Sequence, residues 1–132
     1  MIEAFSKNVT VAGAAQIPLN EVSVLKGRTA ALQGSASIVI NKCGVYKVTV
    51  SANVTPSTAG TASIQMEKNG QLVDNAISQC TAEASTEYAI GFTTIVQVPS
   101  NNDCPCSSPV TIAFVNGLAA SVDINVVLDK IV

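Results

Sequence analysis

The sequence predicts an all-β protein, a sandwich or jelly roll built from eight or more short antiparallel strands. Apolar and polar residues alternate with a period of two through most of the 132 residues, as they do in strands that bury one face. Turn-forming residues separate these runs at intervals of roughly ten residues, which is typical of closed all-β folds. No stretch shows the apolar spacing of an amphipathic helix. These features favour two packed sheets over one open sheet.

The alternation is clearest in the middle and at the end of the chain. Five runs, 45–54, 61–68, 87–99, 109–115 and 121–132, each place apolar residues at every second position. We expect one row in each run to face the core, namely Tyr46, Val48, Val50, Ala52 and Val54, then Ala62, Ile64 and Met66, then Tyr88, Ile90, Phe92, Thr94, Val96 and Val98, then Val110, Ile112 and Phe114, and finally Val122, Ile124, Val126 and Leu128.

One turn is specified by its residues. In "EKNGQ", Asn69-Gly70 lies between two alternating runs, and this dipeptide is the signature of a two-residue β-hairpin, in which both positions need positive φ. Other turn-forming segments, at 42–44, 55–60, 81–86, 99–109 and 116–120, bound the remaining strands.

The composition predicts an oligomer. Hydrophobic residues make up 48% of the chain and charged residues only 12%, about half the usual charged fraction. Apolar residues also interrupt the polar rows at Val39, Ile95 and Val127, so these strands need cover on both faces. We expect these three residues, together with the uncharged tract 29–40, to contact other copies of the chain.

Several functional classes are disfavoured by what the chain lacks. It has no histidine, which removes the commonest general base and the commonest zinc ligand, so no catalytic residue and no cofactor is predicted. The seven basic residues are scattered and the net charge is −2, so we expect no nucleic-acid partner. No run approaches the roughly 18 apolar residues of a membrane span, and the start lacks a signal-peptide pattern, so we expect no membrane partner and folding in a cytoplasm.

The acidic residues give no strong site. Glu83 and Glu87 flank a turn, and Asp123 and Asp129 occupy the polar row of the last strand. Neither pair has the spacing of a calcium loop, and solvated surface charges are the expected reading.

Three cysteines are predicted to share one end of the fold. If 45–54, 62–68, 72–79, 86–98, 110–115 and 121–131 are successive antiparallel strands, Cys43, Cys104 and Cys106 fall at one pole and Cys80 at the other. The group could be partly buried thiols, a disulfide from Cys43 to Cys104 or Cys106 within or between protomers, or a metal site. The Cys-Pro-Cys spacing lacks the two intervening residues of zinc knuckles, so a metal is the least favoured of the three.

The segment from Ile38 to Asn75 resembles the tumour necrosis factor/complement globular-head superfamily. Its pattern of a strand, a short polar turn, Gly-Val-Tyr, a long strand and an Asn-Gly hairpin is carried here by Ile38, Ile40, Gly44, Val45, Tyr46, Val48, Asn69 and Gly70. The chain is most similar to the bacterial and phage branch, which includes the C-terminal domains of collagen-like spore glycoproteins and small phage proteins. It has no Gly-X-Y stalk, which puts a stalk-borne fibre in doubt.

The resemblance implies one jelly-roll domain over residues 1–132, of about 8–10 strands, packed as a homotrimer. It also implies a structural role, so we predict a non-enzymatic virion protein that decorates the capsid or forms a head fibre of a tailed phage. Its partners would be itself and a major capsid or other particle protein, and its location the virion surface. A spore-surface or spore-appendage subunit and a glycan-binding receptor knob are the alternatives.

The first twelve residues are predicted to be either the first strand or an arm that docks on a neighbour. Ile2 and Phe5 are the side chains that would make such a contact.

Overall fold

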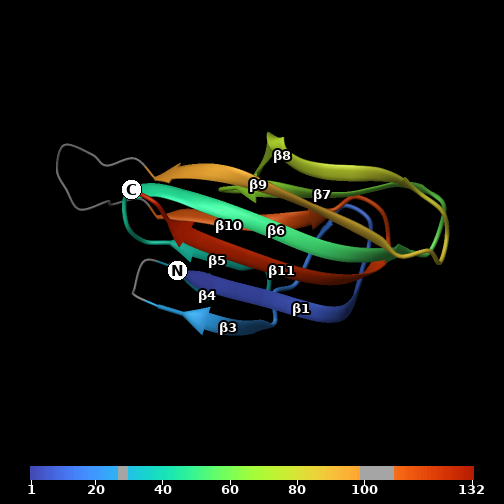
Figure 1. Ribbon diagram of the computed structural model, residues 1–132, viewed down its shortest axis with the longest axis horizontal. Helices are drawn as coiled ribbons and strands as arrows, with labels where there is room; N and C mark the ends of the chain where they lie inside the picture. Colours follow the sequence, from blue (N-terminus) through green and yellow to red (C-terminus); the bar gives the residue numbers. More distant parts are fainter. Residues whose placement is uncertain (27–29, 99–108) are drawn as a thin grey trace.

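The computed structural model describes residues 1–26, 30–98 and 109–132, and these residues form two antiparallel β-sheets packed face to face (Figure 1). The eleven strands within them are β1 (Ile2–Val11), β2 (Ala15–Gln16), β3 (Glu21–Leu25), β4 (Ala30–Gln33), β5 (Ser37–Ile40), β6 (Gly44–Pro56), β7 (Gly60–Lys68), β8 (Gln71–Ala82), β9 (Tyr88–Val98), β10 (Val110–Asn116) and β11 (Ala120–Lys130). The predicted all-β sandwich is confirmed. The described residues include no helix long and apolar enough to cross a membrane.

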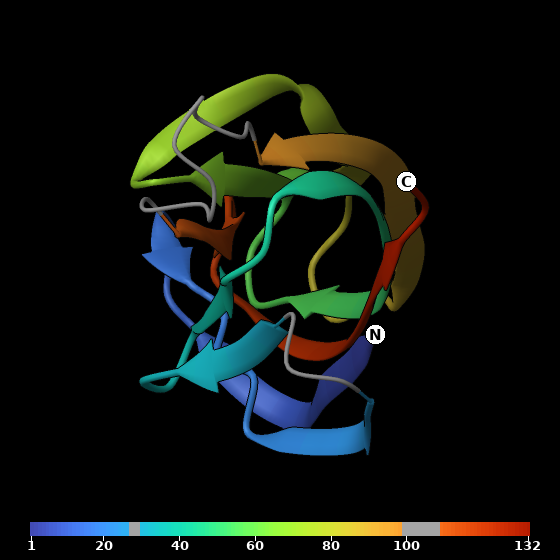
Figure 2. The same ribbon diagram turned by 90° about the vertical axis from the view of Figure 1, so that its left-hand side faces the viewer.

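The strand order is that of a jelly roll. One sheet runs β3-β1-β11-β6-β9 and the other runs β4-β5-β10-β7-β8, with the short β2 pairing β10. Successive strands repeatedly cross between the sheets, so that β6 pairs with β11 and β9 rather than with its neighbours in sequence. Viewed from one end, the two sheets curl around a common core (Figure 2). The two-residue β2 brings the count to eleven, beyond the predicted range of about 8–10.

The predicted apolar rows form the core. Tyr46, Val48, Ile64, Ile112 and Phe114 are among its fully buried side chains. Burying a side chain of this size stabilises the fold by roughly 1.5–3 kcal/mol. Strict alternation along a strand places every second side chain in the core, so each apolar residue of the row contributes this stabilisation.

The hairpin predicted at Asn69-Gly70 joins β7 to β8. Both residues have positive φ, 52° and 81°. Asn69 also ties the turn to β10, since its side-chain oxygen accepts a hydrogen bond from the backbone N–H of Thr111 at 2.9 Å.

The N-terminal residues form β1 inside the five-stranded sheet, where β11 and β3 flank it. A bulge follows the buried Ser6, whose hydroxyl donates to the carbonyl of Pro18 at 2.6 Å and accepts from the N–H of Asn20 at 2.9 Å. Ser6 therefore anchors the segment that leads into β3.

The uncharged tract 29–40 is predicted to contact other copies, and for its outward-facing side chains this stays a prediction. Its described part forms the β4–β5 hairpin of the six-stranded sheet. Ala30, Ile38 and Ile40 are buried in the protomer's own core, whereas Ala31, Leu32 and Val39 are half-buried. Burial within one chain therefore accounts for the inward-facing half of the tract.

The sandwich has two distinct ends. The terminal end carries both chain termini, the 41–43 connection and the Asn69-Gly70 turn, while the far end carries the 57–59, 83–87 and 117–119 connections (Figure 1).

Candidate functional site: an assembly surface

The outer face of the five-stranded sheet is the surface of interest. Strand register sets its side chains in cross-strand rows, one of which runs from Phe5 through Asn125 and Ser51 to Gly91. The adjacent row includes Val127, Thr49 and Thr93. We call these seven residues the central face.

The central face is concave. A trough of about 720 Å³ crosses strands β1, β11, β6 and β9, and every central-face residue except Val127 lines it, together with Phe92 and residues of the next row. Two features make room for it, namely the small side chains of Ser51 and Thr49 and the absence of a side chain at Gly91. A concave surface of this kind can seat the edge of another protein domain.

None of the seven central-face residues is charged, and charged residues border them. Glu3 is directly opposite Val127 at the β1 end of its row. Lys47 and Asp129 are directly opposite each other in the row nearer the terminal end. On the other side, a side-chain oxygen of Asp123 accepts a hydrogen bond from the backbone N–H of Asn8 at 2.6 Å. A neutral centre surrounded by polar and charged groups is the usual layout of a protein–protein interface.

The structure brings together three of the five residues predicted to make contacts. Phe5 and Val127 lie half-buried on the central face, and Ile95 lies on the same sheet face, 55% exposed and paired with Lys47. Val39 is half-buried on β5 of the other sheet. Ile2 is fully buried and contributes to the protomer's own core.

The cysteines are placed only in part. Cys43 lies half-buried between β5 and β6 and is disulfide-bonded. It precedes Gly44, which pairs with Val98 at the end of β9. Cys104 and Cys106 lie outside the described residues, and Cys80 is a free, half-buried thiol on β8 near the far end.

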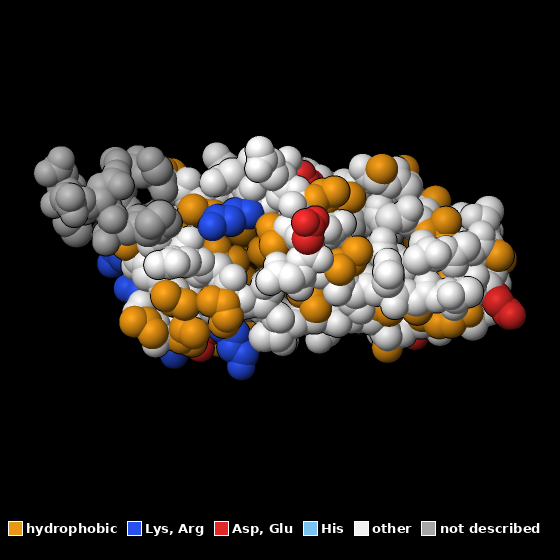
Figure 3. All heavy atoms as spheres, turned by 90° about the horizontal axis from the view of Figure 1, so that it is seen from above, with side chains coloured by type: hydrophobic (Ala, Val, Ile, Leu, Met, Phe, Trp, Pro, Cys, Tyr) orange, Lys and Arg blue, Asp and Glu red, His pale blue; other side chains and the backbone are white. Residues whose placement is uncertain are grey.

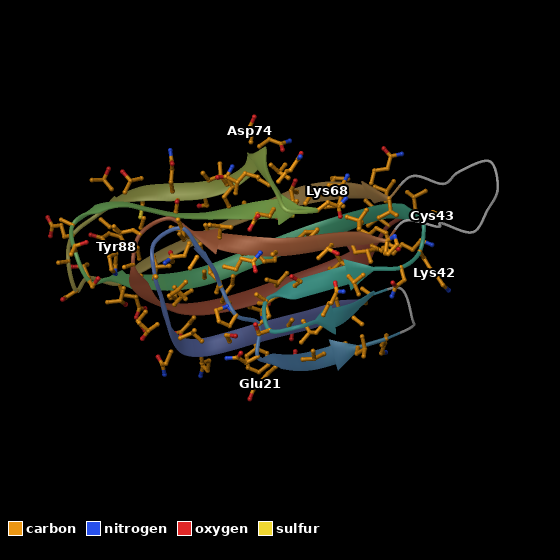
Figure 4. The ribbon with its side chains drawn as sticks, turned by 180° about the vertical axis from the view of Figure 1, so that it is seen from behind. Glu21, Lys42, Cys43, Lys68, Asp74 and Tyr88 are labelled. Atoms are coloured by element: carbon orange, nitrogen blue, oxygen red, sulfur yellow. The ribbon has the colours of Figure 1, made fainter. Side chains whose placement is uncertain are left out.

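Tyr46 holds the connection that carries Cys43. Its fully buried ring ends in a hydroxyl that donates a hydrogen bond to the carbonyl of Lys42 at 2.7 Å. Burial raises the pKa of Tyr46 above its ordinary value of 10.0, so the phenol remains a donor at physiological pH. Figure 4 shows Lys42 and Cys43 together at the terminal end.

The acidic residues form no metal-binding constellation in the described part of the chain, where no three Cys, Asp or Glu side chains gather as ligands. Glu83 and Glu87 are exposed at the far end, as their sequence context predicts.

Sequence reasoning missed the trough itself. The polar rows of β6 and β9 contain unusually small residues, such as Ser51, Ala89 and Gly91, and this was the available signal. These small residues could not predict a trough before the strand register was known, because only the pairing of β6 with β9 places Gly91 opposite Ser51.

Solved structures with the same architecture were found, although no protein-family model matches the chain and no curated protein matches it by sequence. The globular domain of zebrafish complement 1qA protein has a TM-score of 0.76 at 6% identity, covering 99% of this chain and 96% of that one. Eiger TNF from S. frugiperda gives 0.76 at 12% identity, covering 100% of this chain and 92% of that one.

The fold is that of the TNF/complement jelly roll. The same architecture occurs in PRD1 vertex protein P5, which has a TM-score of 0.61 at 16% identity and covers 99% of this chain and 96% of that one. Identities this low establish the fold and leave the role to be argued from the chain's own surface.

Proposed function

We propose that this protein is a non-enzymatic structural subunit that assembles as a homotrimer and decorates the capsid, or forms a head fibre, of a tailed phage. The observation that carries the proposal is the concave central face, neutral within and charged around its margin. Each protomer would lay one edge of its sandwich on this face of the next, and three such head-to-tail contacts close a ring.

Three residues explain why this face suits self-assembly. Phe5 and Val127 offer apolar contact area, and Ile95 exposes 55% of its surface at the β9 edge. Exposed apolar side chains on one sheet face are a common mark of an interaction site.

A role on a virus particle draws support from one structural neighbour. PRD1 vertex protein P5, which bears the name of a vertex protein, shares this fold over nearly the whole chain. The absence of histidine, together with the low content of charged residues, favours a structural role over catalysis.

The glycan-binding knob is a second candidate because of the trough's chemistry. Asn53, Asp123 and Asn125 line it alongside Phe5, and amide and carboxylate groups beside an aromatic ring suit a saccharide. Trimer assembly would cover these groups, so oligomeric state separates the two functions. A spore-appendage subunit would instead give covalent multimers that dissolve only in reductant.

The test is the mass in solution. Light scattering should give a species of about 40 kDa, a trimer of the 13.5 kDa chain, with and without reductant. A stable 13.5 kDa monomer at micromolar concentration would overturn the proposal, as would a ladder that depends on disulfides. Immunogold labelling of particles released by the source cells should then mark the capsid.

A further inference from the structure

We propose that the terminal end is the docking end of the molecule and that its partner is a protein surface with acidic and apolar side chains. The inference rests on the proposed function, because it concerns how the trimer attaches to a particle. It depends on how the exposed charges and the exposed apolar side chains are distributed along the sandwich.

Lysines gather at the terminal end. Of the six lysines in the described residues, only Lys7 lies elsewhere. The other five are at the ends of strands that finish or begin here, or within a few residues of them, namely Lys26, Lys42, Lys47, Lys68 and Lys130. Figure 3 shows the basic side chains concentrated in the half of the surface next to this end.

Exposed apolar side chains gather at the same end. Four large hydrophobic residues that are at least 40% exposed lie there, outside the face assigned to the trimer contact, namely Met1, Leu25, Ile131 and Val132. Met1 and Leu25 belong to neighbouring segments, since the backbone N–H of Lys26 donates to the carbonyl of Met1 at 2.9 Å. Ile131 follows β11 and is held by Val45, whose carbonyl accepts its N–H at 2.8 Å.

The far end has the opposite character. Its connections carry Glu83 and Glu87, and the described residues place no lysine and no strongly exposed large hydrophobic side chain there. A polar, weakly acidic end suits contact with water, whereas a basic and apolar end suits burial against a partner of opposite charge.

The charge pattern favours a protein partner over a lipid surface. Carboxylates lie among the lysines, since Asp129 is opposite Lys47 and Glu3 is on the adjoining β1. An anionic membrane would repel these groups, whereas a protein surface can match both signs.

A second copy of this chain is a poorer partner for the terminal end. The far end could offer Glu83 and Glu87 to the lysines, but it has no large exposed apolar side chain to cover Leu25 or Ile131. We therefore expect trimers not to stack end to end, and the experiment below includes a test for stacking.

The experiment measures rebinding of the purified trimer to particles stripped of it. Lys42→Glu and Lys130→Glu should each weaken binding about fivefold to tenfold, mainly by slowing association, and the loss should shrink at high salt. Leu25→Ser should weaken binding by a similar factor at any salt concentration. The matched control is Thr58→Glu with Thr86→Glu, which makes the same change in net charge at exposed far-end positions and should bind like wild type.

Each other outcome has a distinct meaning. Loss of binding in the far-end control but not in the lysine variants would overturn the docking end while leaving the trimer and its particle intact. Wild-type trimer that never binds particles would count against the proposed function and against this inference. If wild type binds vesicles of phosphatidylcholine and phosphatidylglycerol with the same lysine dependence, the proposed particle protein is not the partner and a lipid surface is. If it sediments as stacked trimers that Glu83→Lys dissolves, the partner is a second copy of this chain, and the proposal is overturned as well.

Discussion

Gly91 on β9 lies directly opposite Ser51 on β6, in the floor of the trough. A β-carbon at Gly91 would collide with the backbone carbonyl oxygen of Val50 on β6. The close approach of β6 and β9 therefore requires glycine at position 91, and so does the shape of the central face.

Gly91→Ala should lower the free energy of unfolding by about 1–3 kcal/mol, because the backbone of β6 or β9 must shift to admit the methyl group. Urea denaturation of the variant measures the loss. Gly13→Ala is the matched control, since its β-carbon would lie at an ordinary 3.6 Å from the nearest atom, the carbonyl oxygen of Gly117. Equal stabilities for the two variants would show that the strands can adjust freely.

Tyr46→Phe should cost about 1–2 kcal/mol, because it leaves the carbonyl of Lys42 without its hydrogen-bond donor while keeping the buried ring. Thermal or urea unfolding at neutral pH measures this. A variant as stable as wild type would mean that water replaces the phenol at the 41–43 connection.

The same residue predicts a dependence on alkaline pH. Burial raises the pKa of Tyr46 in the folded state above 10.0, so the unfolded chain loses this proton first as pH rises. Stability should be level below about pH 10 and fall above it. The difference in free energy of unfolding between wild type and Tyr46→Phe should shrink as the pH rises above about 10. The stability of Tyr88→Phe should still fall over that range, because this variant retains Tyr46. A constant advantage across the range would contradict the prediction.

Val127→Lys should break the trimer without unfolding the protomer. The new charge would lie on the central face opposite Glu3, and a neighbouring protomer that covered this face would desolvate both charged groups. Val39→Lys makes the identical change on the half-buried outer face of the other sheet and should leave a trimer. Light scattering reports the mass and circular dichroism the fold. If Val39→Lys alone dissociates the trimer, the six-stranded sheet makes the contact.

Cys43→Ser should lower stability by about 2–4 kcal/mol under non-reducing conditions, because we predict a disulfide from Cys43 to Cys104 or Cys106 within one protomer. Peptide mapping without reductant identifies the pair. Cys80→Ser, at the free thiol, should leave the disulfide unchanged. A dimer or higher ladder on a non-reducing gel would show that the bridge joins protomers instead.

The alternation of residue types was enough to predict the core-facing row of most long strands. Tyr46 to Val54 and Val122 to Leu128 are buried as expected, because a strand places successive side chains on opposite faces whatever its neighbours are. Asn69-Gly70 likewise determined its own turn, since the required φ values exclude most other residues. The apolar tract around Ala30, Ile38 and Ile40 shows the limit of local patterns, because an apolar side chain has the same sequence signature whether it packs within a chain or between chains.

The sequence by itself determined an all-β chain, the inward row of each long strand and the hairpin between β7 and β8, because each of these follows from interactions between residues close in sequence. Only the tertiary structure decided which rows share a surface. Phe5, Ile95 and Val127 meet on one sheet face because β1, β11, β6 and β9 pair in that order, while Val39 lies on the other sheet and Ile2 lies in the core. Pairing of strands distant in sequence depends on how all the apolar rows are buried together, and no single segment encodes it.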